Sequence, residues 1–124
     1  MSNQQLKIPS PTTLARYGFG FGPAALADTP EDDWRLLLRA HKGSCGACGR
    51  FPPSGRLNID HEHVKNWVKM PPEERRIYVR GLACYMCNHY RLARGANPEN
   101  LRGAADYLER YLKRIAGILG TNHG

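Results

Sequence analysis

Two stretches of the chain place apolar side chains three and four residues apart, as an amphipathic helix does. The first is predicted to run from Pro30 to about His41, because Thr29 can cap it and Pro30 suits the first helical position. Glu31-Asp32-Asp33 then places acids at the positive end of the helix dipole. The apolar side chains on its predicted buried face are Trp34, Leu37 and Leu38.

The second helical stretch is predicted over residues 98–116 and begins at Asn97-Pro98-Glu99-Asn100. Its apolar face carries Leu101, Ala104, Ala105, Leu108, Leu112 and Ile115. A stripe of this kind indicates a buried face or a self-association face rather than a cofactor site.

Between these helices the pattern changes to short strands. Leu57 to His61 alternates apolar and polar side chains, and Tyr78 to Leu82 can supply a second strand. Met70 to Arg76 resembles a helical turn that starts at a proline, and a further helix is predicted from Cys84 through Arg91.

Residues 1–28 are rich in Gly, Pro and Thr, and are predicted to form an extended N-terminal arm. Residues 29–124 are predicted to form a single domain, with its chemistry in residues 44–95 and its last helix at 98–116. We therefore expect a small α+β fold. No apolar run follows the first residues and no stretch is long enough to span a membrane, so we expect a cytoplasmic protein.

The net charge of the chain indicates which kind of molecule it can bind. It has 18 Lys and Arg against 11 Asp and Glu, for a formal net charge of +7. A small basic protein favours a polyanionic partner such as nucleic acid. The alternative is a mildly basic surface that only contacts solvent.

The four cysteines form two Cys-x-x-Cys pairs, Cys45/Cys48 and Cys84/Cys87. Each pair can present two sulfurs to one ion, and two pairs make a closed tetrahedral site for structural zinc. In a reducing compartment this interpretation is favoured over disulfides. The alternative is four free or redox-active thiols.

Polar side chains suited to phosphodiester hydrolysis lie within this cysteine framework. Asp60 and Asn88 offer the hard oxygens that a divalent ion prefers. His61 is a natural general base, since an unperturbed imidazole titrates near neutral pH. His63, on the same strand face, can contact the scissile phosphate or assist proton transfer.

Each of these residues also has a structural alternative. Asp60 can cap a turn, Asn88 can cap a helix, and His61 and His63 can be additional zinc ligands. The arginines that flank the predicted site can hold phosphates or simply contact solvent. They are Arg75, Arg76, Arg80, Arg91 and Arg94.

Asp60-His61-Glu62-His63, followed by Val79 to Asn88 (VRGLACYMCN), resembles the recombination endonuclease VII family of phages, within the His-Asn-His (HNH, ββα-metal) nucleases. The resemblance covers residues 45–95. It implies a zinc-stapled ββα-metal core with flanking N-terminal and C-terminal helices.

The same resemblance implies roles for matching positions. The four cysteines would bind structural zinc, and Asp60 and Asn88 would hold a catalytic Mg²⁺ or Mn²⁺. His61 would be the general base, with His63 and Arg80 assisting at the phosphate. The implied substrate is branched or junction DNA, and the implied assembly is a homodimer. The implied partners are phage packaging or recombination proteins, and the implied location is the cytoplasm of a phage-infected bacterial host.

Two positions depart from the wider HNH pattern. Val79 stands where many HNH nucleases have their middle Asn, which the endonuclease VII branch also lacks. The segment Val64–Tyr78 is longer than the tight turn common in these nucleases. The sequence thus predicts a metal-dependent DNA endonuclease, acting as a junction-resolving dimer, a monomeric nickase or a packaging endonuclease. The alternative is a non-catalytic, zinc-stabilised nucleic-acid-binding protein.

Overall fold

The computed structural model describes residues 6–93 and 95–120. The chain divides into two units, the first ending at Tyr90 and the second beginning at Arg91. The elements in chain order are α1 (Pro11–Arg16), α2 (Pro30–Ala40), β1 (Asn58–His61), η1 (Trp67–Lys69), α3 (Pro72–Ile77), β2 (Val79–Ala83), η2 (Cys87–Arg91) and α4 (Pro98–Ile118). The described residues therefore form the small α+β fold that the sequence predicts.

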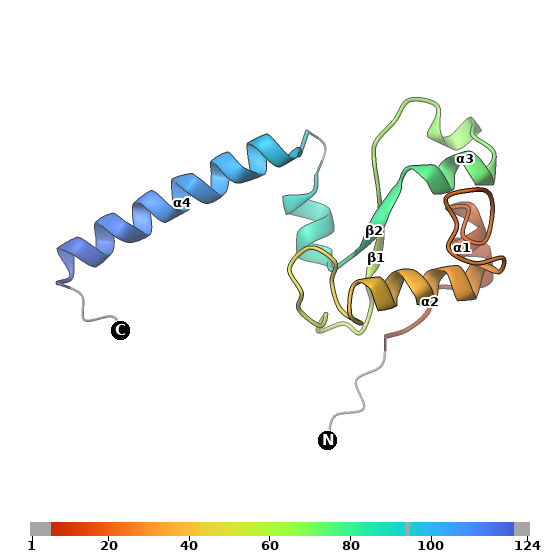
Figure 1. The fold of residues 1–124 in the computed structure, drawn as a ribbon, viewed down its shortest axis with the longest axis horizontal. Coiled ribbons are helices and arrows are strands. Elements are labelled where there is room, and N and C mark those ends of the chain that lie inside the picture. The colour runs from red at the N-terminus through yellow and green to blue at the C-terminus, as the bar shows by residue number, and fades with distance from the viewer. Residues whose placement is uncertain (1–5, 94, 121–124) are drawn as a thin grey trace, which may run out of the picture. The chain divides into compact units, whose positions relative to one another are not determined.

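Strands β1 and β2 form an antiparallel hairpin at the centre of the first unit (Figure 1). The register pairs Asp60 with Gly81 but His61 with Val79, so Arg80 is one extra residue in β2. Such a bulge bends a strand and turns its side chains in new directions. Here it falls at the predicted catalytic dipeptide.

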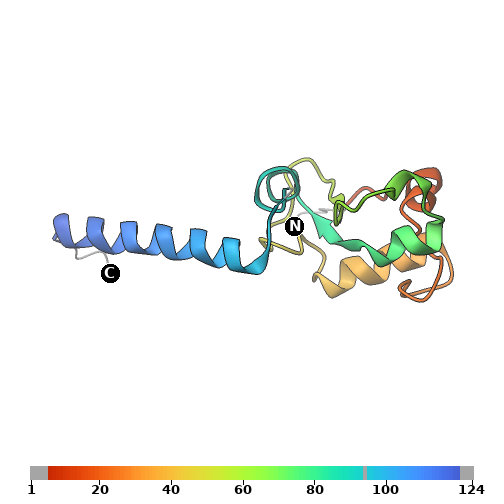
Figure 2. The same cartoon turned by 90° about the horizontal axis from the view of Figure 1, so that it is seen from above.

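Helix α2 runs alongside the hairpin, as Figure 2 shows from above. Thr29 caps it as predicted, its side-chain oxygen accepting from the Asp32 N–H at 3.2 Å. Trp34 is fully buried, whereas Leu37 and Leu38 are only half-buried. The core that α2 helps to cover consists mainly of Leu14, Phe19, Trp34, Leu57, Val79, Leu82 and Ala83.

Residues 11–16 differ from the predicted extended arm, because they form helix α1. Ser10 caps it by accepting from the Thr13 N–H at 3.2 Å, and Pro11 occupies the first turn. Leu14 and Phe19 are buried, so this segment packs into the core. Gly18 makes that packing possible: it has a φ of +81°, and a Cβ there would lie 1.9 Å from the Pro72 carbonyl oxygen.

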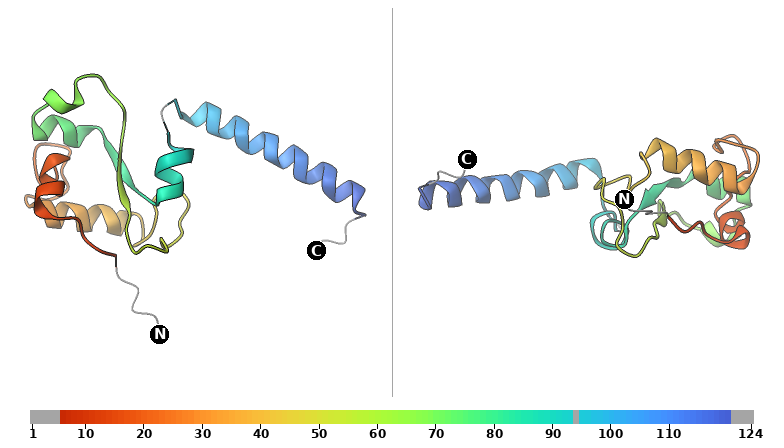
Figure 3. Two further views of the ribbon diagram at one scale, coloured as in Figure 1. Left: turned by 180° about the vertical axis from the view of Figure 1, so that it is seen from behind. Right: turned by 90° about the horizontal axis from the view of Figure 1, so that it is seen from below.

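The segment Val64–Tyr78 contains η1 and α3 and returns the chain to α1 and α2 (Figure 3, left). Arg76 from α3 donates two hydrogen bonds to Asp33 of α2, at 2.8 and 2.9 Å. The Asp33 carboxylate also accepts from the N–H groups of Gly20 and Leu26. Both partners of this pair are buried. The Asp33–Arg76 pair therefore holds the segment Val64–Tyr78 and the residues after α1 against α2.

Burial tends to raise the pKa of Asp33, but the hydrogen bonds from Arg76, Leu26 and Gly20 outweigh it and lower that pKa below its ordinary value of 3.8. Asp33 is therefore ionised at neutral pH. Asp33, whose charge was predicted to favour the start of α2, thus forms a buried ion pair with Arg76 in the fold.

Helix α4 is 21 residues long and extends two residues beyond the prediction. Asn97 caps it, its side-chain oxygen accepting from the Asn100 N–H at 2.8 Å. None of its residues is buried; Leu101, Leu108 and Leu112 are exposed, and Ile115 is half-buried. No helix in residues 6–93 or 95–120 combines the length and apolar character needed to cross a membrane.

Candidate active site and metal centre

The four cysteines converge on one point. Their sulfur atoms all lie within 4.8 Å of one another, and the Sγ atoms of Cys48 and Cys84 are 3.8 Å apart. Four sulfurs placed 2.3 Å from a tetrahedral zinc would be roughly 3.8 Å apart, so this cluster has the size of a Cys₄ zinc site. The cysteines could therefore hold a structural metal such as zinc.

Backbone N–H groups donate hydrogen bonds to the Cys45 sulfur and so favour its thiolate form, which binds cations. The sulfur accepts from the N–H groups of Cys84 at 3.2 Å and of Ala47 and Cys48 at 3.4 Å. Burial tends to raise the pKa of Cys45, but these hydrogen bonds lower it overall, from 9.0 to about 6. The thiolate, which is the form that binds metal, is thus favoured near neutral pH.

His41, at the end of α2, connects the cysteine cluster to the sheet. Its Nε2 accepts from the Leu82 N–H at 3.2 Å, and burial lowers its pKa, which keeps the ring neutral as an acceptor. A Cβ at Gly46 or Gly81 would lie 2.7 Å from this ring. Glycine at both positions therefore lets β2 and the first Cys-x-x-Cys turn approach α2.

The predicted base, His61, lies at the end of β1 with one nitrogen fixed. Its Nδ1 donates to the Glu62 carbonyl oxygen at 2.9 Å. In a neutral ring the lone pair is then on Nε2. The indole of Trp67 stacks on the imidazole, with ring centres 4.0 Å apart and planes 9° apart. The rings of Tyr17 and His63 lie 5.7 and 5.3 Å from it.

Asp60 is almost fully buried and forms a two-pronged ion pair across the hairpin. Arg80 donates to its two oxygens at 2.8 and 2.9 Å. Hydrogen bonding to Asp60 raises the pKa of Arg80. Since Arg80 is the extra residue of the bulge, the irregular register accompanies this contact.

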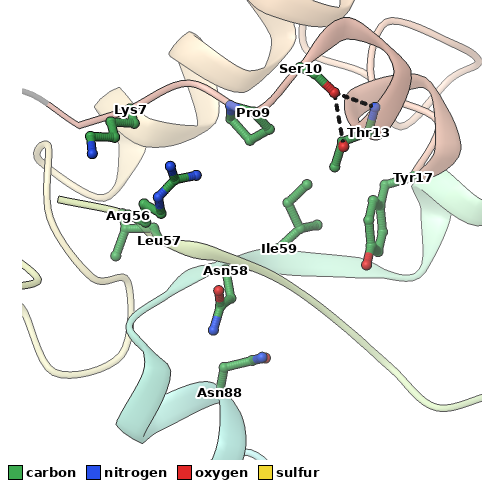
Figure 4. A pocket seen from close by; sticks show the side chains of 10 residues that line it. All are labelled: Lys7, Pro9, Ser10, Thr13, Tyr17, Arg56, Leu57, Asn58, Ile59 and Asn88. Atoms are coloured by element: carbon green, nitrogen blue, oxygen red, sulfur yellow. Dashed lines mark hydrogen bonds between the residues drawn. The ribbon is translucent and has the colours of Figure 1, made fainter. Parts of the chain in front are cut away.

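Asn88 follows the second cysteine pair and faces β1. Its N–H donates to the Cys84 carbonyl oxygen at 2.8 Å, so it lies inside a helical segment and is not an N-cap. Its side chain lies near that of Asn58 (Figure 4). Asn58 and Asp60 are two residues apart, ahead of the bulge, and so point to the same face of β1. Asp60, however, is not among the residues that line the pocket of Asn58 and Asn88, and both of its carboxylate oxygens accept from Arg80.

The alternative of histidine ligands for the zinc receives no support. Within the described part of the chain, the converging group of possible metal ligands contains cysteines only. His63 is exposed, and His61 is held by Glu62 and Trp67.

Two of the predicted nucleic-acid-binding arginines are used inside the fold. Arg76 is buried against Asp33, which does not agree with a role in DNA contact. Arg75 donates to the carbonyl oxygens of Trp67, Val68 and Arg16. Arg91 is exposed, and Arg94 lies outside the described residues.

Several residues at this site did not stand out in the sequence. Trp67 reaches His61 from η1, and Tyr17 reaches it from the end of α1. Lys7 and Arg56 line the pocket that also contains Asn58 and Asn88. The aromatic side chains at positions 17 and 67 were the only sign of these contacts in the sequence. Their common partner, His61, is more than five residues away from each of them in the chain.

Residues 15–110 match the protein-family model described as recombination endonuclease VII. This range includes the cysteine cluster, Asp60, His61, His63 and Asn88. No curated protein and no solved structure matches the chain.

Proposed function

The chain belongs to the recombination endonuclease VII family, which implies nuclease activity on DNA, and from that premise we propose that it is a metal-dependent endonuclease of the HNH type. In this proposal His61 is the general base, Asp60 and Asn88 hold a divalent ion, and the four cysteines hold structural zinc. The order β1, β2, η2, with the cysteine cluster beside it, is consistent with a ββα-metal core.

One arrangement of atoms carries the assignment of the base. The bond from His61 Nδ1 to the Glu62 carbonyl selects the tautomer whose Nε2 can accept a proton. The stacked Trp67 ring restricts the imidazole to one plane. A base held in this way can take a proton from a water molecule without first reorienting.

Asp60 and Asn88 would hold Mg²⁺ or Mn²⁺, since both offer hard oxygen donors. When bound, such an ion supplies positive charge for the phosphate and the leaving oxygen. Arg80 orients the Asp60 carboxylate through two hydrogen bonds. Its side chain is 36% exposed, and in this proposal it assists at the phosphate together with exposed His63.

The test is cleavage of supercoiled plasmid with Mg²⁺ or Mn²⁺ by wild type, His61→Ala and His89→Ala. His89 is an exposed histidine on η2, so its variant loses an imidazole elsewhere. We expect His61→Ala to lose about 10²–10⁴-fold in rate, the usual contribution of a general base, and His89→Ala to lose far less. Equal zinc content and equal circular dichroism would show that the three proteins are folded.

A His61→Ala variant that cuts like wild type would show that another group is the base. A folded, zinc-loaded wild type that cuts neither plasmid nor a four-way junction would instead support a non-catalytic nucleic-acid-binding protein.

The proposal extends to a homodimer that acts on branched DNA. Apolar side chains of α4 and of its C-cap Leu119 alternate steps of four and three residues, as in the seam of a coiled coil: Leu101, Ala105, Leu108, Leu112, Ile115 and Leu119. A second copy of α4 would cover this stripe, and a symmetric dimer supplies the two active sites that a junction requires. Phage recombination or packaging proteins in an infected bacterium are the partners in this proposal.

A further inference from the structure

A pocket of about 500 Å³ beside β1 has a lining suited to anions (Figure 4). Lys7 and Arg56 are its cationic residues, and none of the described residues that line it is acidic. Hydroxyl and amide groups complete the polar lining, namely those of Ser10, Thr13, Tyr17, Asn58 and Asn88. We propose that this pocket is a subsite for backbone phosphates of the DNA strand next to the bond that is cut.

The pocket is built by backbone contacts that hold the two cations beside each other. The Lys7 N–H donates to the Gly55 carbonyl oxygen at 2.8 Å, which fastens the segment before α1 along the start of β1. The Arg56 N–H donates to Ser54 Oγ at 3.2 Å. Both side chains are exposed, and neither forms an ion pair with another described residue. Their charges are available to a ligand.

The pocket adjoins the proposed active site at two points. Asn88 is part of its wall, and so is Tyr17, whose ring lies 5.7 Å from that of His61. In Figure 4, Lys7 and Arg56 lie at the opposite end of the pocket from Tyr17. Arg56 precedes His61 by five residues, which is at most roughly 17 Å of extended chain. A DNA strand whose scissile phosphate is at His61 would place neighbouring phosphates over the cations.

The chemistry of the lining selects a phosphodiester chain rather than a carboxylate partner. Lys and Arg supply charge, and the hydroxyl and amide donors can bind the additional oxygens of a phosphate. Such contacts position the strand without reading its sequence. This subsite rests on the proposed nuclease function, and it assigns positioning roles to Lys7 and Arg56.

The experiment measures binding of a fluorescent duplex and a fluorescent four-way junction by anisotropy, between 50 and 300 mM NaCl. All proteins carry His61→Ala, so that cutting does not disturb the measurement. The test variant adds Lys7→Gln and Arg56→Gln. The matched control adds Arg35→Gln and Arg39→Gln, which remove the same charge from exposed positions on α2 that do not line the pocket.

Loss of two phosphate contacts should make the slope of log K against log salt less steep by about 1.8 on duplex DNA, and should raise Kd at least roughly tenfold at 100 mM salt. The control should change the slope by less than half as much. A methylphosphonate placed one to three phosphates from the cut site should weaken binding of the parent protein but not of the test variant.

Equal slopes and equal Kd values for the test and control variants would overturn the subsite. That failure is separate from failure of the proposed function. A protein with His61 intact that binds DNA but never cuts it would contradict the nuclease, even if Lys7 and Arg56 were required for binding.

Discussion

The cysteine cluster and the surroundings of His61 are two sites within one small unit, and the chain specifies them in different ways. In the cluster, each Cys-x-x-Cys turn supplies two ligands of one type to one point. Around His61 the contacts are mixed: a hydrogen bond to the neighbouring Glu62 carbonyl, and ring contacts with His63 and with Trp67 and Tyr17 from two other segments.

The two sites therefore depend on the fold in different ways. Metal binding can itself draw the two cysteine pairs together, because the binding free energy is available to folding. The groups around His61 have no such common ligand. Their positions depend on the packing of α1 and of the segment Val64–Tyr78, which the Asp33–Arg76 pair anchors.

The largest expected effect comes from removing the metal. Cys84→Ser, or chelation of the wild type, should unfold residues 6–90, since structural zinc contributes on the order of 10–16 kcal/mol and small domains have only about 5–15 in total. Circular dichroism, with metal analysis giving one zinc per chain, measures this. Zinc added after chelation should restore the signal. A fold that persists without zinc would show that packing alone specifies both sites.

The next largest effect is expected from Asp33→Asn, which leaves Arg76 as an unpaired buried charge. Removing one partner of a buried ion pair costs about 3–5 kcal/mol, so denaturant unfolding should shift by this amount while zinc stoichiometry stays at one. Glu31→Gln is the control, because its pair with Arg35 is more than half exposed. An equal shift in the two variants would mean that the buried pair does not anchor the Val64–Tyr78 segment.

The same pair gives a defined pH dependence. The pKa of Asp33 is lowered on folding, so its ionised form stabilises the fold above the unfolded value near 3.8, and this contribution is lost as pH falls through the lower folded value. The stability difference between wild type and Asp33→Asn should therefore be constant from pH 8 to 5. A difference that already shrinks between pH 7 and 5 would contradict this assignment.

A smaller effect is expected from Trp67→Leu, which tests whether the stacked ring positions His61. The imidazole would lose its flat support, and kcat should fall on the order of tenfold with KM nearly unchanged. Trp67→Phe should restore part of the rate. Val68→Ala is the control, since Val68 is 79% exposed. Equal kcat values for Trp67→Leu and Val68→Ala would show that stacking has no role in catalysis.

The parts of the structure that could be predicted from sequence are those with a local signal. Thr29-Pro30 predicted the start of α2, and the paired cysteines predicted a metal cluster. Ser10-Pro11 carries the same kind of signal for α1, but the glycines that follow it favoured an extended arm. Gly18 and Gly22 permit a tight approach to α3, and Gly20 permits one to the start of α2, so the segment folds back rather than extending.

The parts that could not be predicted depend on the direction of a side chain. Arg75 and Arg76 are adjacent cations in the sequence, and charge alone cannot distinguish a DNA contact from a buried pair. Likewise, nothing local to Trp67 indicates that its ring covers His61. These contacts appear only when segments distant in the chain are folded together.

The buried pair between residues 33 and 76, and the cysteine cluster that joins residues 45 and 87, also have a consequence during synthesis. Helix α2 is complete at residue 40 and α1 precedes it, but Arg76 and strand β2, which complete its surroundings, come more than thirty residues later. At a synthesis rate of about 5–20 residues per second, Cys87 follows residue 40 by roughly 2–10 seconds. For that interval Trp34 has no completed core to enter. Helix α2 therefore gains its full set of partners only after the last cysteine of the cluster has been translated.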